Sequence, residues 1–236
     1  MALENKLGIS DSSALAREEE RISKKKAVEL FESGVLDTLE SGTFSTLAEI
    51  HRWLFGEIYA FAEEIRTVNL AKGAFRFAPV LYLREALRNI ERMPQASFDE
   101  VVEKYVEMNI AHPFREGNGR SMRIWLDHML KTALGKVVDW SRVNQEDYLF
   151  AMERSPVRDT EIKHILKNAL TDQVNDREIY MDWENAQFII LYTSFQVFGR
   201  TYPPQKAHYS GKNESGSDFL PLWEATPKPS KIQPQF

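Results

Sequence analysis

The sequence predicts an all-α protein, and three observations lead to that prediction. Apolar residues recur at spacings of three and four along most of the chain, which is the period of an amphipathic helix. Several of these segments begin or end at residues that favour helix termini, such as Ser97 and Gly135. Alternating strand patterns are scarce, and the best candidate, residues 72–78, is long enough only for a short β-hairpin.

Two helices are expected in the first third of the chain. A short one runs from about Ile22 to Gly34, since a glycine commonly terminates a helix. A longer amphipathic helix is expected from Ser45 to Ile65, where apolar residues keep the helical spacing throughout. The residues before the first helix, 1–20, are expected to be a flexible N-terminus.

Local signals place the later helices. Pro79 favours the start of a helix, and Ser97 with Glu100 forms a capping-box pattern at the head of the next one. A further helix is expected from about Asn118 to Leu134, with Gly135 as its stop. Two more are expected over residues 145–154 and 160–170.

These elements suggest a core domain followed by two smaller segments. The core covers residues 21–174, and a C-terminal helix is expected over residues 175–198. The composition then changes to Pro, Ser, Gly and Lys, so residues 199–236 are expected to form an extended or disordered polar tail.

The composition excludes several classes of protein. The chain has 236 residues, a net charge of −5 and no cysteine, so disulfides and thiolate metal sites are excluded and general nucleic-acid binding is disfavoured. The N-terminus lacks the apolar stretch of a secretory signal, and the longest apolar run, residues 188–192, is too short to cross a membrane. We therefore expect no membrane or nucleic-acid partner and a cytoplasmic protein.

The densest cluster of chemistry is HPFREGNGRSMR, residues 112–123. It joins two predicted helices, and a loop that leads into a helix presents unpaired backbone N–H groups and the positive end of a dipole. Gly117 and Gly119 allow a phosphate to approach these amides closely. Arg120 and Arg123 are three residues apart, so they share a face of the first helical turn and can both reach an anion.

Two further side chains complete this cluster. Glu116 would repel a bare phosphate, but it suits a site where Mg²⁺ bridges carboxylate and phosphate oxygens. His112 can act as a general base near neutral pH. A base, a metal-binding carboxylate, a phosphate nest and two arginines together indicate phosphoryl or nucleotidyl transfer.

The cluster resembles the signature of the Fic (filamentation induced by cAMP) family, HxFx[D/E]GNGRxxR. Every fixed position is filled, including Phe114, a packing residue, whereas Arg115 stands at the variable position and is expected in solvent. The resemblance covers roughly residues 20–185 and includes FESG, HRWLFGEIY, KGAFRF, EMNIAHPF and AMERSPV. It is closest to small single-domain bacterial Fic proteins, some of which are toxins or secreted effectors, so delivery to a host cell is an alternative to a cytoplasmic location.

The resemblance implies the helical Fic fold with a β-hairpin flap, and the activity of a protein adenylyltransferase. Such an enzyme transfers AMP from ATP to a Tyr, Ser or Thr hydroxyl of a target protein and releases pyrophosphate. His112 would deprotonate the hydroxyl, and Glu116 would hold the Mg²⁺ that bridges the α- and β-phosphates. The implied phosphate-binding residues are Gly117, Asn118, Gly119, Arg120 and Arg123. The implied flap, which would align the target by strand addition, comprises Lys72, Gly73, Ala74, Phe75 and Arg76.

The resemblance weakens near the C-terminus. Small Fic proteins of this type carry an inhibitory helix with the pattern [S/T]xxxE[G/N], whose glutamate pairs with the second arginine of the motif. The corresponding positions here are Ala186, Ile190 and Leu191. Three explanations stay open: the chain is not inhibited in cis, a separate antitoxin polypeptide inhibits it, or this segment has diverged.

Alternatives to AMP transfer also stay open. Some Fic-fold proteins transfer phosphate, UMP or phosphocholine, although phosphate-transferring relatives depart from the GNGR sequence that is intact here. A nucleotide-binding interaction module is the second alternative, and the intact His112 argues against it because binding needs no base. Self-association into a homo-oligomer is a further open alternative. His51 and His128 are expected to be structural.

Overall fold

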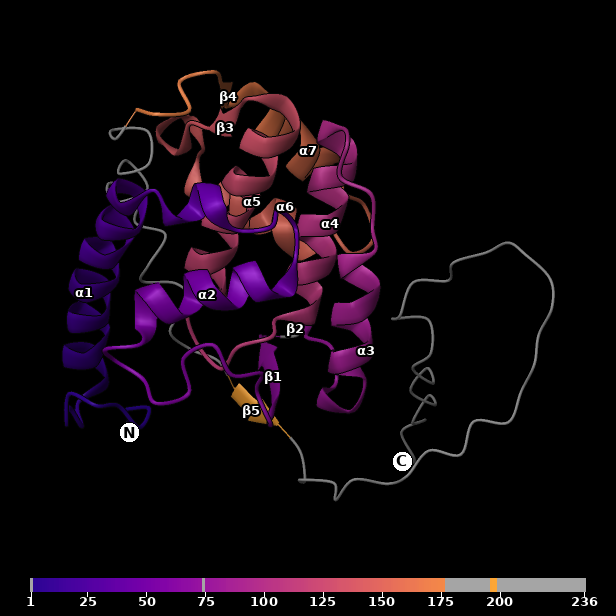
Figure 1. The fold of residues 1–236 in the computed structure, drawn as a ribbon. Coiled ribbons are helices and arrows are strands. Elements are labelled where there is room, and N and C mark those ends of the chain that lie inside the picture. The colour runs from indigo at the N-terminus through magenta and orange to yellow at the C-terminus, as the bar shows by residue number, and fades with distance from the viewer. Residues whose placement is uncertain (1, 74, 177–195, 199–236) are drawn as a thin grey trace, which may run out of the picture. The chain divides into compact units, whose positions relative to one another are not determined.

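The computed structural model describes residues 2–73, 75–176 and 196–198. The described part is mainly helical, which confirms the predicted fold class (Figure 1). Its helices are α1 (Ser12–Ser33), η1 (Val35–Thr38), α2 (Phe44–Phe55), α3 (Val80–Glu91), α4 (Phe98–Ala111), α5 (Asn118–Leu134), η2 (Trp140–Arg142), α6 (Gln145–Arg154) and α7 (Thr160–Asn168). Its strands are β1 (Asn69–Lys72), β2 (Phe75–Arg76), β3 (Val137–Val138), β4 (Leu170–Thr171) and β5 (Gln196–Phe198).

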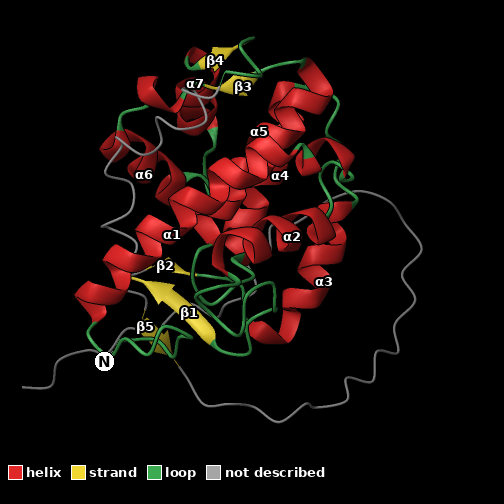
Figure 2. Cartoon of the chain, turned by 60° about the vertical axis from the view of Figure 1, so that its left-hand side comes forward, coloured by secondary structure: helices red, strands yellow, loops and turns green. Residues whose placement is uncertain are grey.

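Helix α5 is the centre of the core. Most of its residues are buried, and it packs against α2 and α4, while α1 packs on α2 and α3 on α4. Figures 1 and 2 show α5 enclosed by these helices. The largest fully buried side chains include Trp125 of α5 itself and, outside it, Trp140, Tyr105 and Phe114. The residues that precede α5 are therefore attached to a helix that is largely buried in the core.

The helix-terminus signals in the sequence are confirmed. The Ser97 hydroxyl accepts the Glu100 N–H, and the Glu100 carboxylate accepts the Ser97 N–H, so the predicted capping box starts α4. Helix α5 has the predicted bounds, and Gly135 ends it in the left-handed conformation. Helix α3 begins directly after Pro79, as predicted.

The prediction of a flexible N-terminus is wrong for residues 2–20. Helix α1 starts at Ser12, where the Asp11 carboxylate accepts the Ala14 N–H at 2.7 Å. The residues before it are also tied to the core, since the Lys6 N–H donates to the Ile58 carbonyl at 2.7 Å. The apolar pattern showed only the part of this helix after Ile22, because Glu19, a charged residue, occupies a buried position in the part before it.

The long helix expected from Ser45 to Ile65 is shorter than predicted. It ends at Phe55, and the chain continues in tight turns in which the Ile58 and Tyr59 amides both bond to the Phe55 carbonyl. Both side chains remain buried in this turn. The apolar spacing thus extends past the end of the helix, because turns as well as helices can return side chains to the core.

Two small antiparallel sheets complete the fold (Figure 2). The predicted hairpin exists as β1 and β2, with Lys72 opposite Phe75. On its other side β1 pairs with β5, so residues 196–198 are a strand although a helix was expected over 175–198. A strand here supplies hydrogen bonds to a strand edge that would otherwise lack them. The pairing of β3 with β4 was not predicted, because runs of two residues carry no readable pattern.

Other predictions fall outside the described residues. Most of the expected C-terminal helix, including the inhibitory positions Ala186, Ile190 and Leu191, and the whole tail 199–236 lie there. Among the described helices, none combines the length and apolar character needed to cross a membrane.

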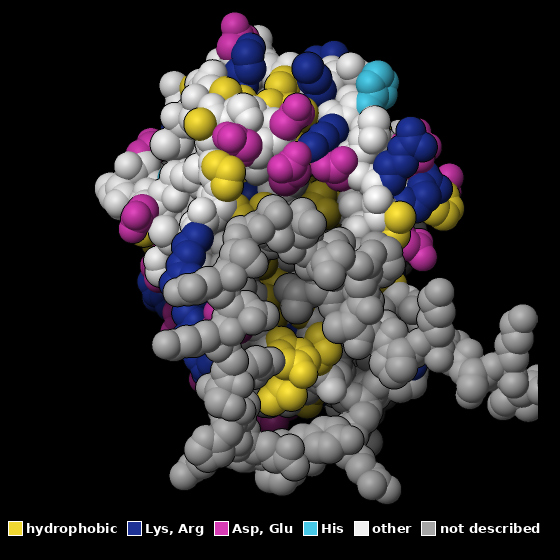
Figure 3. All heavy atoms as spheres, turned by 90° about the vertical axis from the view of Figure 1, so that its right-hand side faces the viewer, with side chains coloured by type: hydrophobic (Ala, Val, Ile, Leu, Met, Phe, Trp, Pro, Cys, Tyr) yellow, Lys and Arg dark blue, Asp and Glu magenta, His cyan; other side chains and the backbone are white. Residues whose placement is uncertain are grey.

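The surface of the described part carries charges of both signs. Basic and acidic side chains are interspersed over the upper part of the face in Figure 3. Many form ion pairs along or between helices, such as Lys163 with Asp159 and Glu103. Exposed pairs of this kind contribute little individually to the free energy of folding.

Candidate active site

The motif forms a compact loop between α4 and α5. His112 ends α4 in the left-handed conformation with φ 49°, and Gly117 precedes α5 with φ 78°. The side chain of Asn118 closes the loop: its Oδ1 accepts the Phe114 N–H at 2.9 Å, and its Nδ2 donates to the Phe114 carbonyl at 2.8 Å. Phe114 itself is fully buried, as predicted.

His112 is a buried, neutral base. Its ring stacks on Phe77 with 3.8 Å between ring centroids. Burial, followed by the positive charge of Arg66, lowers the pKa of His112 to about 3. The Nδ1 atom lies 3.3 Å from the Asn109 carbonyl, which can only accept a hydrogen bond. Nδ1 therefore carries the proton, and the basic lone pair is on Nε2.

Glu116 is the carboxylate of the loop, and it is almost completely buried. Burial and the nearby Glu19 raise its pKa to about 7, against the opposing charge of Arg120 at 3.9 Å. Its Oε1 accepts the Gly117 N–H at 3.0 Å. In the described ranges no three metal-binding side chains converge. Glu116 fits Mg²⁺, an ion that takes one or two protein carboxylates and completes its coordination with water and substrate phosphates.

The two glycines of the loop differ in what requires them. A Cβ atom on Gly117 would lie 2.4 Å from the Phe55 ring, so packing as well as its positive φ demands glycine there. At Gly119 the nearest neighbour of an added Cβ is Nη1 of Arg123, at 3.9 Å. Gly119 is therefore not required by packing, and its lack of a side chain leaves the first turn of α5 accessible to a ligand.

The two arginines of the motif contact different elements. Arg120 forms a buried ion pair with Glu19 of α1, donates to the Ser23 hydroxyl at 3.0 Å and lies over the Phe55 ring. The Tyr59 hydroxyl donates to the same Glu19 carboxylate.

Arg123 extends the other way, toward the C-terminal half of the core. Its guanidinium carbon lies 5.6 Å from the centre of the Trp140 ring, and it hydrogen-bonds the Tyr148 hydroxyl. The sequence predicted that Arg120 and Arg123 lie on one face of the first helical turn. It did not predict that Glu19, Ser23 and Tyr148 are their partners. Nothing in the composition of α1 or α6 distinguishes these residues from ordinary helix residues.

The structure places the predicted flap next to the predicted base. Phe77, which follows β2, links them, since it stacks on His112 and contacts Phe75 edge-on at 5.1 Å. Lys72, at the end of β1, is half-buried, which lowers its pKa, and Glu153 of α6 opposes that shift. Ala74, in the turn of the hairpin, lies outside the described residues.

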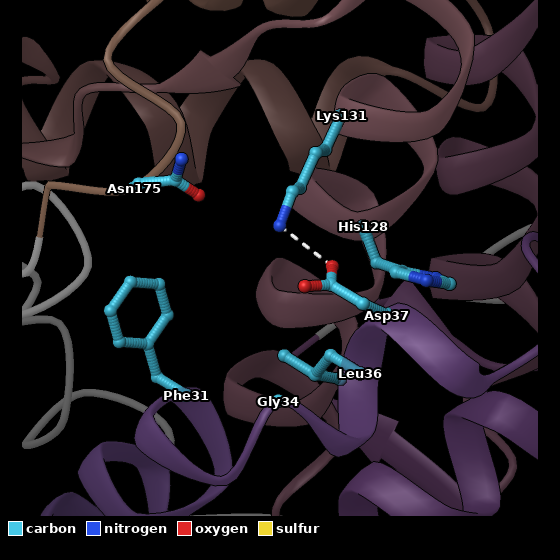
Figure 4. Close-up of a pocket in the computed structure, with 7 residues that line it drawn as sticks. All are labelled: Phe31, Gly34, Leu36, Asp37, His128, Lys131 and Asn175. Carbon is cyan, nitrogen blue, oxygen red and sulfur yellow. Dashed lines mark hydrogen bonds and ion pairs between the residues drawn. The ribbon is translucent and has the colours of Figure 1, made fainter.

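Of the other two buried histidines, His51 has contacts that fit the expected structural role. His51 donates from Nε2 to the Glu116 carbonyl at 2.8 Å, accepts the Glu63 N–H at Nδ1 at 2.9 Å and stacks on Phe114. His51 therefore holds the loop through the Glu116 carbonyl and the Phe114 ring. His128 lines a separate pocket with Asp37 and Lys131, which form an ion pair of 2.7 Å (Figure 4). No residue of the motif lines that pocket.

Comparisons with known proteins identify the family. A sequence model of the Fic/DOC family matches residues 42–130, which include the loop as far as Arg123. The chain is also 30% identical over 165 residues to "Probable protein adenylyltransferase y4lH" of Sinorhizobium fredii, covering 65% of this chain and 82% of that relative. The chain belongs to the Fic/DOC family. Within it, "Protein adenylyltransferase VbhT" of Bartonella schoenbuchensis is 28% identical over 189 residues, 74% of this chain, which spans only 38% of the length of that relative.

Solved structures show the Fic fold directly. The crystal structure of BepC, a VirB-translocated effector protein of Bartonella tribocorum, with bound AMPPNP superimposes with a TM-score of 0.62 at 20% identity, covering 73% of this chain and 94% of that one. The two curated relatives carry the name protein adenylyltransferase, so AMP transfer is the activity associated with this family.

Proposed function

We propose that this chain is a Mg²⁺-dependent protein adenylyltransferase that transfers AMP from ATP to a hydroxyl group of a target protein. The observation that carries the proposal is the buried, neutral His112, fixed directly before the N-terminus of α5 in a complete Fic motif. The names of the relatives and the AMPPNP bound in the BepC structure support the same activity and the same nucleotide.

In the proposed reaction, Nε2 of His112 takes the proton of a Tyr, Ser or Thr hydroxyl. The hydroxyl oxygen attacks the α-phosphorus of ATP, the bond from that phosphorus to the β-phosphate oxygen breaks, and pyrophosphate leaves. His112 can accept this proton because it is neutral before the step and its Nδ1–H is directed to the Asn109 carbonyl, although burial makes it a weaker base than a free imidazole.

The phosphates would bind at the start of α5. The amides of Gly117, Asn118 and Gly119 and the helix dipole favour negative charge there. The side chain of Asn118 is already engaged with Phe114, so we assign its phosphate contact to the backbone N–H. Glu116 would hold Mg²⁺, which when bound neutralises the charge on the α- and β-phosphates.

The arginines would neutralise the leaving group. Arg123 lies beside Gly119 and is assigned to the terminal phosphate. Arg120 uses Nη2 for Glu19 and Nη1 for Ser23, and a guanidinium carries five N–H donors, so donors remain for the β-phosphate. Its ion pair with Glu19 also holds the loop against α1.

Partners and regulation are part of the proposal. The target protein would dock along the flap, by addition of an extended segment to β2. Whether inhibition is absent, intramolecular, or supplied by a separate antitoxin polypeptide depends on residues 177–195, which lie outside the described part. Self-association and delivery to a host cell likewise stay predictions.

Parallel incubations with two labelled forms of ATP test the activity. The purified chain is mixed with bacterial lysate and Mg²⁺, together with ATP labelled at either the α- or the γ-phosphorus. Label in protein from the α position alone indicates transfer of AMP, and label from the γ position alone indicates transfer of phosphate. Label from neither position would contradict the proposal, provided that the same sample binds ATP and that a target protein of a close relative has been added.

A further inference from the structure

We propose that Arg66 is a positioning residue that fixes the backbone of His112 and both ends of the flap in a single arrangement. The inference rests on the proposed function, since it concerns how a hydroxyl on a docked target reaches the base. Arg66 lies outside the motif, between α2 and β1, and its side chain is buried with only 4% of its surface exposed.

The guanidinium of Arg66 donates to four backbone carbonyls that belong to two different parts of the site. Two belong to the C-terminus of α4: Nε donates to His112 at 2.7 Å, and Nη2 donates to Ala111 at 3.1 Å. The other two flank the flap: Nη1 donates to Val68 at 2.7 Å, and Nη2 also donates to Ala78 at 2.5 Å. One planar group therefore joins the residue that carries the base to the chain entering and leaving the hairpin.

Backbone hydrogen bonds tighten the same junction. The Arg66 N–H donates to the Pro113 carbonyl at 2.8 Å, and the Ala78 N–H donates to the Ile110 carbonyl at 2.9 Å. Phe77, next to Ala78, stacks on the His112 ring. The flap and the base are thus connected by the backbone on one side and by the ring contact on the other.

An arginine is suited to this position for two reasons. The last carbonyls of a helix lack intrahelical partners, and a planar guanidinium can bond several of them at fixed angles, whereas an ammonium cannot match that geometry. Burial lowers the pKa of Arg66 only to about 10, so the group remains charged at neutral pH. Its four hydrogen-bond partners are neutral carbonyls, which do not cancel its charge. The positive charges of Arg66 and Lys72 lower the pKa of His112, whereas the hydrogen bond to the Asn109 carbonyl raises it.

The consequence is geometric. A target segment paired with β2 takes its position from the flap, and the proton is accepted by His112, so transfer requires that the two keep their relative placement. Misplacement of reacting groups by about 1 Å can cost about 10²-fold in rate. Loss of the guanidinium should therefore reduce the rate of transfer more than it reduces binding of ATP, which is assigned to the other side of the loop.

The test compares Arg66→Lys with Arg88→Lys. Arg88 is an exposed residue of α3 that pairs with Glu85, so its replacement is a matched arginine-to-lysine control. Labelling from α-³²P-ATP is measured at several ATP concentrations, with the lysate protein that the wild type modifies as acceptor. For Arg66→Lys we expect the maximal rate to fall by about 10²-fold, with the apparent KM for ATP close to the wild-type value. An unchanged maximal rate, or a rate and an ATP affinity that fall together, would overturn the proposal.

Hydrogen exchange provides a measurement that does not depend on activity. In Arg66→Lys the amide protons of Ala78 and His112 should exchange faster, while those of α5 should exchange as in the wild type. If that variant does not fold, the wild type decides: the amides of Ala78 and His112 should open together as one unit. Independent opening of the two would overturn the positioning role. If the wild type labels no protein but these exchange results hold, the proposed function fails and the link between flap and base stands.

Discussion

At the scale of single residues, His112 must be buried and still present a proton acceptor. Burial alone would give a histidine with two possible tautomers, either of which could face the substrate. The Asn109 carbonyl selects one of them, and the Phe77 ring fixes the plane of the imidazole. The residue that bears the base, His112, also ends α4, and its backbone has the left-handed conformation.

Replacing this base should separate catalysis from nucleotide binding. His112→Ala should reduce AMP transfer by about 10²–10⁴-fold, the usual contribution of a general base, because the imidazole acts on the target hydroxyl and not on ATP. Transfer is followed with α-labelled ATP, and ATP binding is followed by calorimetry on the same sample. His164→Ala, at an exposed position of α7, is the matched control. Wild-type labelling by His112→Ala would disprove the assigned mechanism.

Glu116 gives a second prediction at this scale. Glu116→Gln has nearly the same shape but lacks the charge that attracts a cation, so it should abolish Mg²⁺-dependent transfer. EDTA should abolish transfer by the wild type, and added Mg²⁺ should restore it. Binding of Mg²⁺ with ATP is measured by calorimetry for both proteins. Equal activity in EDTA and in Mg²⁺ would rule out the metal-binding role of Glu116.

The motif residues could be read from the sequence because they are contiguous and chemically unusual. Their supports could not. Glu19, Tyr59, Arg66 and Tyr148 come from four separate segments, and each is a common residue type in an ordinary context. Their importance depends on contacts across the fold, such as that of Arg120 with Glu19, 101 positions away in the chain. No local pattern encodes such a pairing.

At the scale of elements, α1 is part of the site and not an appendage. Its buried Glu19 and Ser23 both contact Arg120, and its apolar residues Leu15, Ile22 and Leu30 pack into the core. The same glutamate that anchors the loop also interrupts the apolar pattern by which a helix is recognised. Helices α3 to α6 were predicted well because their termini carry explicit capping signals and their buried faces are mostly apolar.

Three consecutive glutamates in α1 provide an internal comparison. Glu19→Gln leaves the buried Arg120 charge without its closest carboxylate, and breaking a buried ion pair commonly costs about 3–5 kcal/mol. Glu18→Gln removes only an exposed pair with Arg21, which should change the free energy of unfolding by less than about 1 kcal/mol. Urea denaturation of both variants measures the difference. Equal stabilities would show that the contact between Glu19 and Arg120 contributes little.

At the scale of the whole molecule, the buried ionisable groups have opposing effects on stability. Burial lowers the pKa of His51 and His112 to about 3, and it raises the pKa of Glu116 and Asp127 to about 7. Below pH 6.5 the unfolded chain binds protons at these histidines that the folded chain does not, so the histidines lower stability on acidification. Between pH 7 and pH 4 the folded chain binds protons at the two carboxyl groups that the unfolded chain does not, so these raise stability.

The two effects should nearly cancel in the wild type and should separate in Asp127→Asn. Each pKa unit corresponds to about 1.4 kcal/mol, so between pH 7 and pH 5 each histidine lowers the free energy of unfolding by about 2 kcal/mol and each carboxyl group raises it by a similar amount. Asp127 accepts hydrogen bonds from the Val138 amide and the Trp140 indole, so Asp127→Asn should be less stable at both pH values.

The informative quantity is the change in the free energy of unfolding with pH. The wild type should vary little, and Asp127→Asn should lose about 2 kcal/mol more than the wild type on going from pH 7 to pH 5. Urea denaturation at constant ionic strength measures it, with Asp172→Asn, at an exposed position after β4, as the control. If Asp127→Asn showed the wild-type dependence on pH, Asp127 would be ionised in the folded protein at pH 5, and its hydrogen bonds would outweigh its burial.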